Sequence, residues 1–260
     1  MNKIGILYIG IGQYACFWPE FYESCEKNFV TGAMKQYFVF TDKDYITPKN
    51  NIEVFHQDDM GWPCNSLLRF KMFSRIEGKL QNYDFLFFFN SNAKIIRPVS
   101  SEDILPIDED FSALCIEDNP EKMSFESRPV SAAYVSKNEA NYYFSGALNG
   151  GKCKAYLKLI KSCDQIVNTD IQNGIMPLWH DESVLNRYLL GKRVKIMYRD
   201  MGKPANWKKP TNAKIILRRK EDILGRNWLR QYKGRKHTQT WLRKIWNRMK
   251  MAITSLITKQ

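Results

Sequence analysis

Runs of apolar residues near the N-terminus predict a β-strand, an α-helix and a second strand. Residues 4–12 and 37–42 are rich in β-forming side chains, and residues 17–29 between them place apolar side chains at helical spacing. A strand, a helix and a strand in this order need a right-handed crossover, which favours two parallel strands in one sheet.

The next segments continue the alternation of strands and helices. Residues 52–56 predict a strand, and residues 66–79 predict a helix with apolar side chains along one face. Residues 83–89 form a continuous apolar run, which is typical of a strand covered on both faces. The run ends at the polar residues 90–92, and ligands of open α/β sheets bind outside the carboxyl ends of such strands.

Two further helices are expected after the glycine-rich residues 145–151. The first spans about residues 152–173, and the second follows the polar residues 179–182 and runs through Leu190. The chain has no internal repeat and no low-complexity linker up to this point. We therefore expect residues 1–220 to form one α/β domain.

The C-terminal segment has a different pattern. In residues 225–260 aromatic and aliphatic side chains recur at helical spacing among Lys and Arg. Residues 214–260 carry 14 Lys and Arg against 2 Asp and Glu, a net of +12 out of +13 for the whole chain. We expect residues 221–260 to be a basic amphipathic extension that either contacts the anionic inner face of a membrane or packs on the catalytic domain.

The composition favours a globular protein of the cytoplasm. The 260 residues are 44% hydrophobic, and they include neither an uncharged apolar run of about 18 residues nor a signal-peptide cleavage site. The six Cys and three His form no CxxC pair and no ligand cluster, so we expect neither disulfides nor zinc. The basic tail comes without a nucleic-acid motif, so nucleic acid is not expected as a partner.

Two asparagines are the first candidates for chemistry. Asn90 and Asn92 follow a buried strand and lie two residues apart, so their side chains are expected to face the same way. Amides are much weaker ligands of a hard divalent cation than carboxylates are. Taken alone, two turn-forming asparagines at the end of a strand are the simpler interpretation.

Residues 179–182 combine an indole, an imidazole and two carboxylates at a loop-to-helix junction. An indole stacks on sugar faces, and adjacent carboxylates can serve as a nucleophile and as a hydroxyl acceptor. The alternative is an ordinary helix N-terminus that Asp181 or Ser183 caps.

Taken together, these segments resemble glycosyltransferase family six, which includes the histo-blood group A and B transferases, the α-1,3-galactosyltransferase and the Forssman synthase. The resemblance runs from about residue 4 to residue 220, and it is carried by residues 37–42, 127–134, 139–151, 173–175, 179–183 and 185–186. The Asp-x-Asp acids of the family are replaced by Asn90 and Asn92, and the family's membrane-anchor stem is absent, as in its bacterial members.

The resemblance implies an α/β fold of the GT-A type with a Rossmann-like mixed central sheet. It implies a retaining enzyme that transfers N-acetylgalactosamine or galactose from its UDP conjugate, in α-1,3 linkage, to a galactose-containing oligosaccharide with or without fucose. Because the metal-binding acids are replaced, no divalent metal cofactor is expected. A catalytically inactive UDP-sugar or glycan-binding module is the alternative, although the presence of Trp179, Asp181 and Glu182 together argues against it.

The resemblance also implies residue roles. UDP binding falls to Ile9, Gly10, Ile11, Tyr14, Asn65, Asn90, Asn92, His180, Arg218, Arg219 and Lys220. Catalysis falls to Glu182, Asp181 and Arg69, and acceptor binding to Trp179, Glu182 and Ser124. The triplet Ser145, Gly146 and Ala147 matches the positions that sort the two donor sugars, and its small first residue with a terminal Ala favours N-acetylgalactosamine.

The loss of a metal removes about two positive charges beside the departing UDP. Arg218, Arg219, Lys220 and Arg69 are the dense supply of cations that could replace it, because guanidinium groups bind phosphate oxygens bidentately. Glu182 is expected either to form a covalent glycosyl-enzyme or to stabilise an oxocarbenium-like state during front-face attack. The sequence leaves both routes open.

Overall fold

The computed structural model describes residues 1–136, 139–206 and 212–228. None of the helices in these ranges has the length and apolar character that a membrane span requires. Most of the predicted extension, residues 229–260, lies outside the described residues, so membrane contact and the domain boundary at residue 220 stay predictions.

Up to residue 89, strands and helical segments follow one another in the order that the sequence pattern predicts. The strands are β1 (Lys3–Ile9), β2 (Met34–Thr41), β3 (Ile52–His56), β4 (Phe85–Phe89), β5 (Ala93–Ile95), β6 (Phe111–Glu117), β7 (Tyr143–Lys152), β8 (Val194–Met197), β9 (Gly202–Pro204) and β10 (Ile215–Leu217). The helices are α1 (Trp18–Asn28), α2 (Cys64–Leu67), α3 (Arg69–Ser74), α4 (Glu77–Leu80), α5 (Ser101–Ile104), α6 (Cys153–Gln172), α7 (Asp181–Leu189) and α8 (Lys220–Leu224), with 3-10 helices η1 (Gly12–Phe17) and η2 (Pro120–Lys122).

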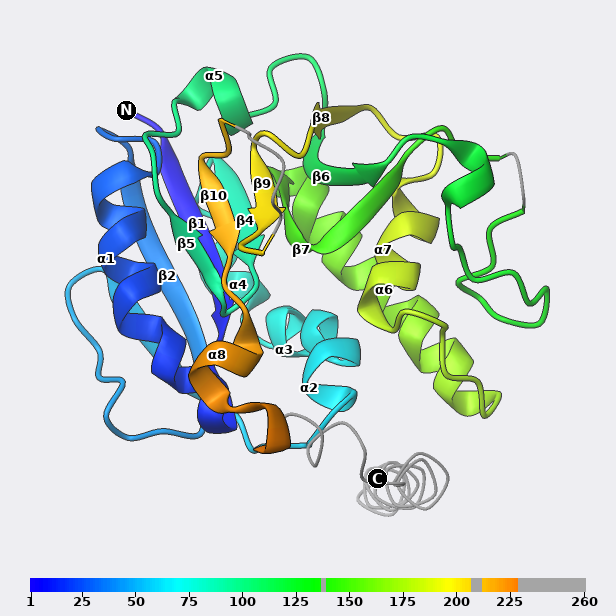
Figure 1. The fold of residues 1–260 in the computed structure, drawn as a ribbon, viewed down its shortest axis with the longest axis horizontal. Coiled ribbons are helices and arrows are strands. Elements are labelled where there is room, and N and C mark those ends of the chain that lie inside the picture. Colours follow the sequence, from blue (N-terminus) through cyan, green and yellow to red (C-terminus); the bar gives the residue numbers. More distant parts are fainter. Residues whose placement is uncertain (137–138, 207–211, 229–260) are drawn as a thin grey trace.

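A mixed sheet forms the centre of the molecule (Figure 1). Its strand order among the described residues is β3-β2-β1-β4-β7-β6-β8, and β7 is antiparallel to both of its neighbours while the other pairs are parallel. The predicted strand-helix-strand opening is confirmed by the parallel pairing of β1 with β2. A second, smaller sheet has the order β5-β10-β9. The predicted α/β class with a mixed central sheet is therefore confirmed.

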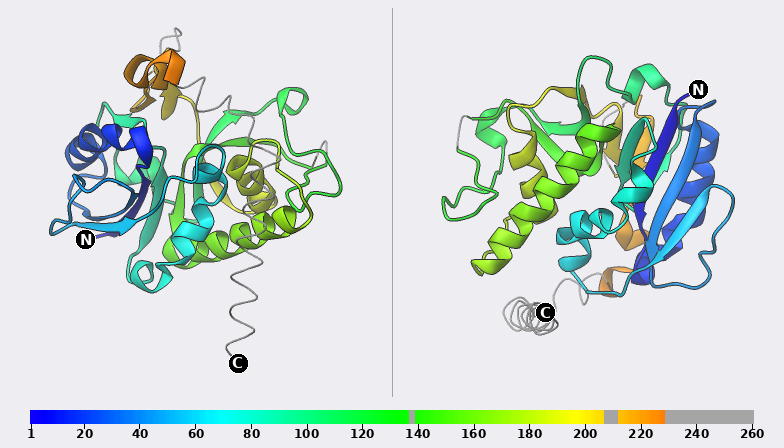
Figure 2. Two further views of the ribbon diagram at one scale, coloured as in Figure 1. Left: turned by 90° about the horizontal axis from the view of Figure 1, so that it is seen from below. Right: turned by 180° about the vertical axis from the view of Figure 1, so that it is seen from behind.

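Helices cover both faces of the central sheet, as the views in Figure 2 show. On one face Phe87 and Phe89 of β4 contact Phe29, which follows α1, and on the other face Phe88 contacts Phe73 of α3. All five side chains are at most 3% exposed. The continuous apolar run of β4 is thus explained by burial on both faces, which removes any reason for polar alternation.

The predicted single helix over residues 66–79 is wrong. The structure has three short helices there, with interruptions at Leu68 and at Ile76. The apolar positions in this stretch repeat every three residues, whereas an α-helix has about 3.6 residues per turn, so one straight helix would rotate them steadily out of the core. The breaks restore the facing, and they leave Arg69 at the start of α3 almost fully buried, with 1% exposure.

Candidate active site

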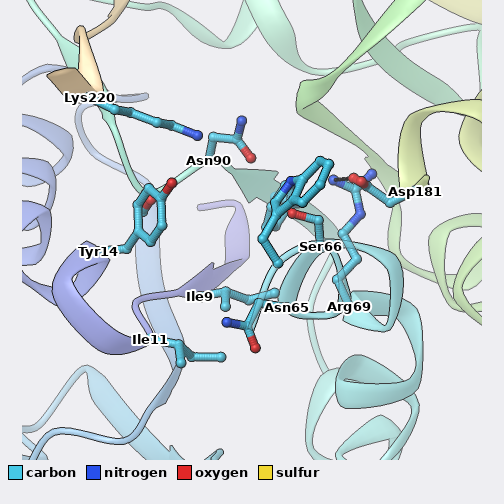
Figure 3. A pocket seen from close by; sticks show the side chains of 12 residues that line it. Ile9, Ile11, Tyr14, Asn65, Ser66, Arg69, Asn90, Asp181 and Lys220 are labelled. Atoms are coloured by element: carbon cyan, nitrogen blue, oxygen red, sulfur yellow. Dashed lines mark ion pairs between the residues drawn. The ribbon is translucent and has the colours of Figure 1, made fainter. Parts of the chain in front are cut away.

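A pocket opens at the carboxyl ends of β1 and β4, on the edge of the sheet where the apolar run of β4 stops (Figure 3). About 690 Å³ of space not filled by protein atoms, open solvent included, lies within it. Its lining comprises Ile9, Ile11, Tyr14, Trp62, Asn65, Ser66, Arg69, Phe88, Asn90, Ser91, Asp181 and Lys220. Eight of the residues predicted to bind or process the donor therefore line one cavity.

Arg69 forms one wall of this pocket. Its Nη1 donates to the carbonyl oxygen of Gly146 at 2.7 Å and pairs with Oδ2 of Asp181 at 2.7 Å. The guanidinium also lies over the ring of Phe88 at 4.4 Å from the centroid. Among the described residues, its Nε and Nη2 have no hydrogen-bond partner although both are buried. Two buried donors thus remain for a bound ligand.

Asp181 and Glu182 begin α7 and lie opposite Gly146 of β7. Glu182 Oε2 accepts from the backbone N–H of Gly146 at 2.7 Å, and its Oε1 accepts from the hydroxyl of Tyr143 at 2.9 Å. A Cβ atom on Gly146 would lie 3.1 Å from Asp181 Oδ2 and 3.3 Å from Glu182 Cβ. The glycine therefore lets the backbone of β7 approach both carboxylates closely.

Burial raises the pKa of Glu182, and the N–H of Gly146 and the hydroxyl of Tyr143 oppose this shift because they donate to the charged form. The neighbouring charges act in opposite directions, since Asp181 raises this pKa and Arg69 lowers it. A carboxylate with this environment titrates above the ordinary range of glutamate and holds its charge through a few defined donors.

We expect Tyr143→Phe to move the acid limb of the kcat profile to higher pH. The hydroxyl donates to the ionised carboxylate, so its loss raises the pKa of Glu182 further, and the enzyme then loses the active carboxylate at a higher pH as acid is added. The measurement is kcat against pH, with Tyr142→Phe as the matched control on the exposed neighbouring residue. An unmoved acid limb would contradict this role for the phenol.

The uridine end of the predicted site gathers around Tyr14. The ring stacks on Phe17 with a centroid distance of 6.3 Å, meets Trp228 edge-on at 5.7 Å, and has Nζ of Lys220 5.0 Å from its centroid. Burial raises the pKa of Tyr14 to about 12, so the phenol is neutral at physiological pH. Figure 3 shows Tyr14, Lys220 and Asn90 on one side of the pocket and Arg69 with Asp181 on the other.

Four further candidates for UDP binding have defined surroundings. Ile9 and Ile11 line the pocket, and Gly10 lies between them with its N–H donating to the carbonyl oxygen of Phe40 at 2.9 Å. Asn65 also lines the pocket, and its amide donates to Asp59 Oδ1 at 2.7 Å. The pocket floor is therefore apolar, with an amide held by a carboxylate at its rim.

Asn90 and Asn92 do not face the same way, so that prediction is wrong. Asn90 lines the pocket, whereas Asn92 is 6% exposed and its Nδ2 donates to the carbonyl oxygen of Arg218 at 2.6 Å. Alternation of facing holds only within a strand, and β4 ends at Phe89. The N–H of Ala93 donates to the carbonyl oxygen of Asn90 at 2.9 Å, a turn that sends the two side chains apart.

The three consecutive cations have different surroundings. Lys220 lines the pocket. Arg218 instead pairs through Nη1 with Glu20 at 2.9 Å and lies 4.8 Å from the ring centroid of Phe17, and Arg219 lies 3.6 Å from Asp222. Of this run, only Lys220 contributes to the pocket lining.

Two of the predicted acceptor residues, Trp179 and Ser124, lie beside one another on the surface, whereas the third, Glu182, is largely buried. Trp179 is 48% exposed, and its Nε1 donates to Oγ of Ser124 at 3.2 Å. The next residue, His180, has a φ of 55°, which is rare for a residue with a side chain, and its ring meets Trp62 edge-on at 5.0 Å. The backbone at His180 turns the chain sharply between the exposed indole and the two acids of α7.

The donor-sorting triplet lies in β7 rather than in a loop. Ser145 and Ala147 are 8% and 4% exposed, and the N–H of Ala147 lies 3.2 Å from Oγ of Ser145. Farther along the strand, a Cβ on Gly150 would lie 2.2 Å from the ring of Phe87 and 2.6 Å from the carbonyl oxygen of Leu86. The glycines of this run allow β7 to pack directly against β4.

Several contributors to the site were missed by sequence reasoning, namely Tyr143 beside Glu182 and the pocket-lining residues Trp62, Ser66, Phe88 and Ser91. Tyr143 appears as one of several apolar residues at the start of a strand, and no local signal marks its contact with a carboxylate 39 positions away. Trp62 is part of the pocket wall but precedes the irregular helical region, where the expected elements were incorrect. The signal that could have identified Trp62 is its large aromatic side chain in a loop, because aromatic side chains often line ligand pockets.

In the part of the chain that the structure describes, no group of three or more His, Cys, Asp and Glu side chains lies close enough to hold a metal ion. The pocket presents an amide from Asn90 where a hard cation would need carboxylate oxygens. The residues at the end of β4 therefore do not fit a divalent metal.

Comparison with known proteins identifies relatives along most of the chain. A family model described as glycosyltransferase family 6 matches residues 2–220. The chain is 32% identical over 224 residues to the O-antigen biosynthesis glycosyltransferase WbnI of Escherichia coli, covering 84% of this chain and 95% of that protein. It is 30% identical over 198 residues to histo-blood group ABO system transferase 1 of Rattus norvegicus and 27% identical over 205 residues to globoside alpha-1,3-N-acetylgalactosaminyltransferase 1 of Homo sapiens. Each of these two matches covers 73% of this chain and 57% of the mammalian protein, so the chain spans little more than half their length.

Proposed function

The chain belongs to glycosyltransferase family 6 and has the GT-A type fold of that family, and we propose that it transfers N-acetylgalactosamine or galactose from UDP to a galactose-containing acceptor. In this proposal the new bond is an α-1,3 linkage, formed with retention and without a divalent metal. Transfer of a sugar from a nucleotide donor to a glycan is the activity that membership supports. The observation that carries the finer proposal is the carboxylate of Glu182, held by Gly146 and Tyr143 beside the donor pocket.

In this proposal the nucleotide occupies the side of the pocket near Tyr14. The ring of Tyr14 and the apolar side chains of Ile9 and Ile11 offer a flat, apolar bed for a base, and Lys220 supplies positive charge for the diphosphate. The donor sugar then lies toward Arg69 and Asp181, where buried guanidinium donors and a carboxylate can bind its hydroxyls.

Glu182 acts on the anomeric carbon in the proposed reaction. As the bond between that carbon and the departing phosphate oxygen breaks, the bonding electrons leave with UDP and positive charge develops on the sugar. A carboxylate fixed before the reaction stabilises this charge without having to reorganise. The same carboxylate can bond to the carbon from the opposite face, or it can remain ionic while the acceptor hydroxyl attacks and gives its proton to the departing phosphate.

The donor preference is proposed from the triplet in β7. Ser145 is small enough to leave room for an acetamido group, while Ala147 removes part of the space on the same strand. We expect UDP-N-acetylgalactosamine to be the better donor. The assay compares kcat/KM for the two UDP-sugars with one galactoside acceptor.

The decisive experiment measures UDP release with a β-galactoside acceptor in the presence and absence of EDTA. We expect the rate to be unchanged by chelation, because Asn90 presents an amide to the pocket and Asn92 faces the backbone of Arg218. An absolute Mn²⁺ requirement in the purified protein would contradict metal independence. Binding of UDP without release from either donor would instead identify a non-catalytic UDP-sugar-binding protein.

A further inference from the structure

Two buried carboxylates outside the donor pocket take no part in the proposed chemistry. Glu126 is 1% exposed and Asp170 is 0% exposed. Both accept hydrogen bonds from the segment of residues 124–135, which crosses the surface between β6 and β7. Buried carboxylates are costly unless they are fully paired, so two of them that accept from one surface segment call for an explanation.

Glu126 has every oxygen lone pair engaged. Its Oε1 accepts from the backbone N–H of Arg128 at 3.0 Å and from Nε of Arg128 at 2.8 Å. Its Oε2 accepts from Nη2 of Arg128 at 2.6 Å and from the backbone N–H of Leu178 at 2.7 Å. Nη2 of Arg128 also donates to the carbonyl oxygen of Met176 at 2.6 Å. One carboxylate thus joins its own segment to the backbone on the N-terminal side of α7.

The residues joined in this way are the neighbours of Trp179. Leu178 precedes Trp179 directly, and Ser124, two residues before Glu126, accepts from the indole Nε1 at 3.2 Å. Trp179 is 48% exposed, so core packing cannot fix the orientation of its ring. The segment that Glu126 anchors therefore holds the indole and the backbone of the preceding Leu178, while the N–H of Trp179 itself donates to Oγ of Ser183 at 2.9 Å.

Asp170 secures the other end of this segment. Its Oδ2 accepts from the hydroxyl of Ser131 at 2.6 Å and its Oδ1 accepts from the N–H of Ala132 at 2.6 Å. Its carbonyl oxygen also accepts from the N–H of Ile175 at 2.7 Å. Because Asp170 lies in the last turn of the 20-residue helix α6, it connects the segment to a rigid element of the fold.

We propose that Glu126 is a positioning residue for acceptor binding, which through Arg128 and Leu178 fixes the orientation of Trp179 over the acceptor sugar. The inference rests on the proposed function, since it takes the exposed indole as the acceptor platform. Hydrogen bonds from Arg128 hold the pKa of Glu126 below its ordinary range, which is consistent with a permanently charged anchor. None of the contacts of Glu126 reaches the donor pocket, so donor and acceptor binding should respond differently to its loss.

The test is Glu126→Gln, compared with Glu121→Gln on an exposed acid of η2, which precedes the segment. An amide of the same shape has one acceptor oxygen, so it cannot serve all the donors of Arg128 and the N–H of Leu178. We expect the acceptor KM to rise about tenfold through misplacement of the platform, with an unchanged UDP dissociation constant and an unchanged rate of donor hydrolysis in the absence of acceptor. Glu121→Gln should match the unaltered enzyme.

Two further measurements keep this proposal separate from general instability. Hydrogen exchange in Glu126→Gln should accelerate over residues 124–135 and 175–180 but not in α6, and Arg128→Lys, which keeps the charge and loses the fork of donors, should show a smaller rise in the acceptor KM. An unchanged acceptor KM, unchanged exchange, or an equal loss of UDP affinity would each overturn the proposal. Absence of transfer to any galactoside by the unaltered protein would overturn the proposed function. In that case hydrogen exchange still tests the role of Glu126 by itself, because unchanged exchange in Glu126→Gln would show that Glu126 does not hold the segment.

Discussion

Replacing Glu182 by Gln is expected to lower kcat by about three orders of magnitude while the dissociation constant of UDP stays nearly constant. In the proposed reaction the charge of Glu182 acts on the anomeric carbon in the transition state, and its side chain is not part of the pocket lining at the uridine end. The measurements are steady-state turnover and calorimetric UDP binding on the same preparations. Glu102→Gln, an exposed acid in the first turn of α5, is the matched control.

This variant also separates catalysis from folding. Burial raises the pKa of Glu182, so the native protein binds that proton more tightly than the unfolded chain does, and stability falls as pH rises through the unfolded pKa toward the native one. At neutral pH the ionised carboxylate therefore destabilises the fold, and a neutral amide of the same shape removes that cost. We expect the thermal midpoint of Glu182→Gln to equal or exceed that of the unaltered protein. Near-normal turnover would reduce Glu182 to an acid that merely favours the start of α7.

The strands β1 to β4 and the long helices α1, α6 and α7 were predictable because each has one dominant pattern. The continuous apolar run of β4 and the helical spacing of α6 depend on burial of a whole face, which any compact fold requires. The strand direction of β7 carries no such signal. Its glycines allow it to pack against β4 in the antiparallel sense, and that choice depends on contacts between residues far apart in sequence, such as Leu86 with Gly151.

The facing of a site residue was predictable where the residue lies at the end of a helix or strand. It was not predictable where the residue lies in a turn. Arg69 and Asp181, which the resemblance assigned to the same site, meet because the start of α3 and the start of α7 both face the pocket. Asn92 and Arg218 differ from expectation because the backbone turns after β4, and the two residues then bind each other across the small sheet. A charge pattern shows that cations are adjacent in sequence, but it does not show which of them faces a ligand.

This separation of the cations leads to the last prediction, that Lys220→Met lowers kcat by about a hundredfold and that Arg219→Met leaves it unchanged. Without a metal, the departing diphosphate needs a positive charge at the pocket, and of residues 218–220 only Lys220 lines it. Arg219 is the matched control, because it is a neighbouring cation that lies 3.6 Å from Asp222 instead.

Arg218→Met tests the same assignment by a different route. Its guanidinium pairs with Glu20 and lies over Phe17, and its backbone is held by Asn92, so its loss should lower the thermal midpoint and should affect kcat only through the placement of Lys220. We expect the ratio of kcat at low and at high salt to collapse in Lys220→Met alone, since a charge at the leaving group is screened by ions. Equal losses of kcat in all three variants would mean that residues 218–220 stabilise the departing diphosphate through their summed charge and not through a contact by Lys220. Unaltered kinetics in Lys220→Met would instead leave Arg69 as the counter-charge for UDP, because it lines the same pocket and has two buried donors without partners among the described residues.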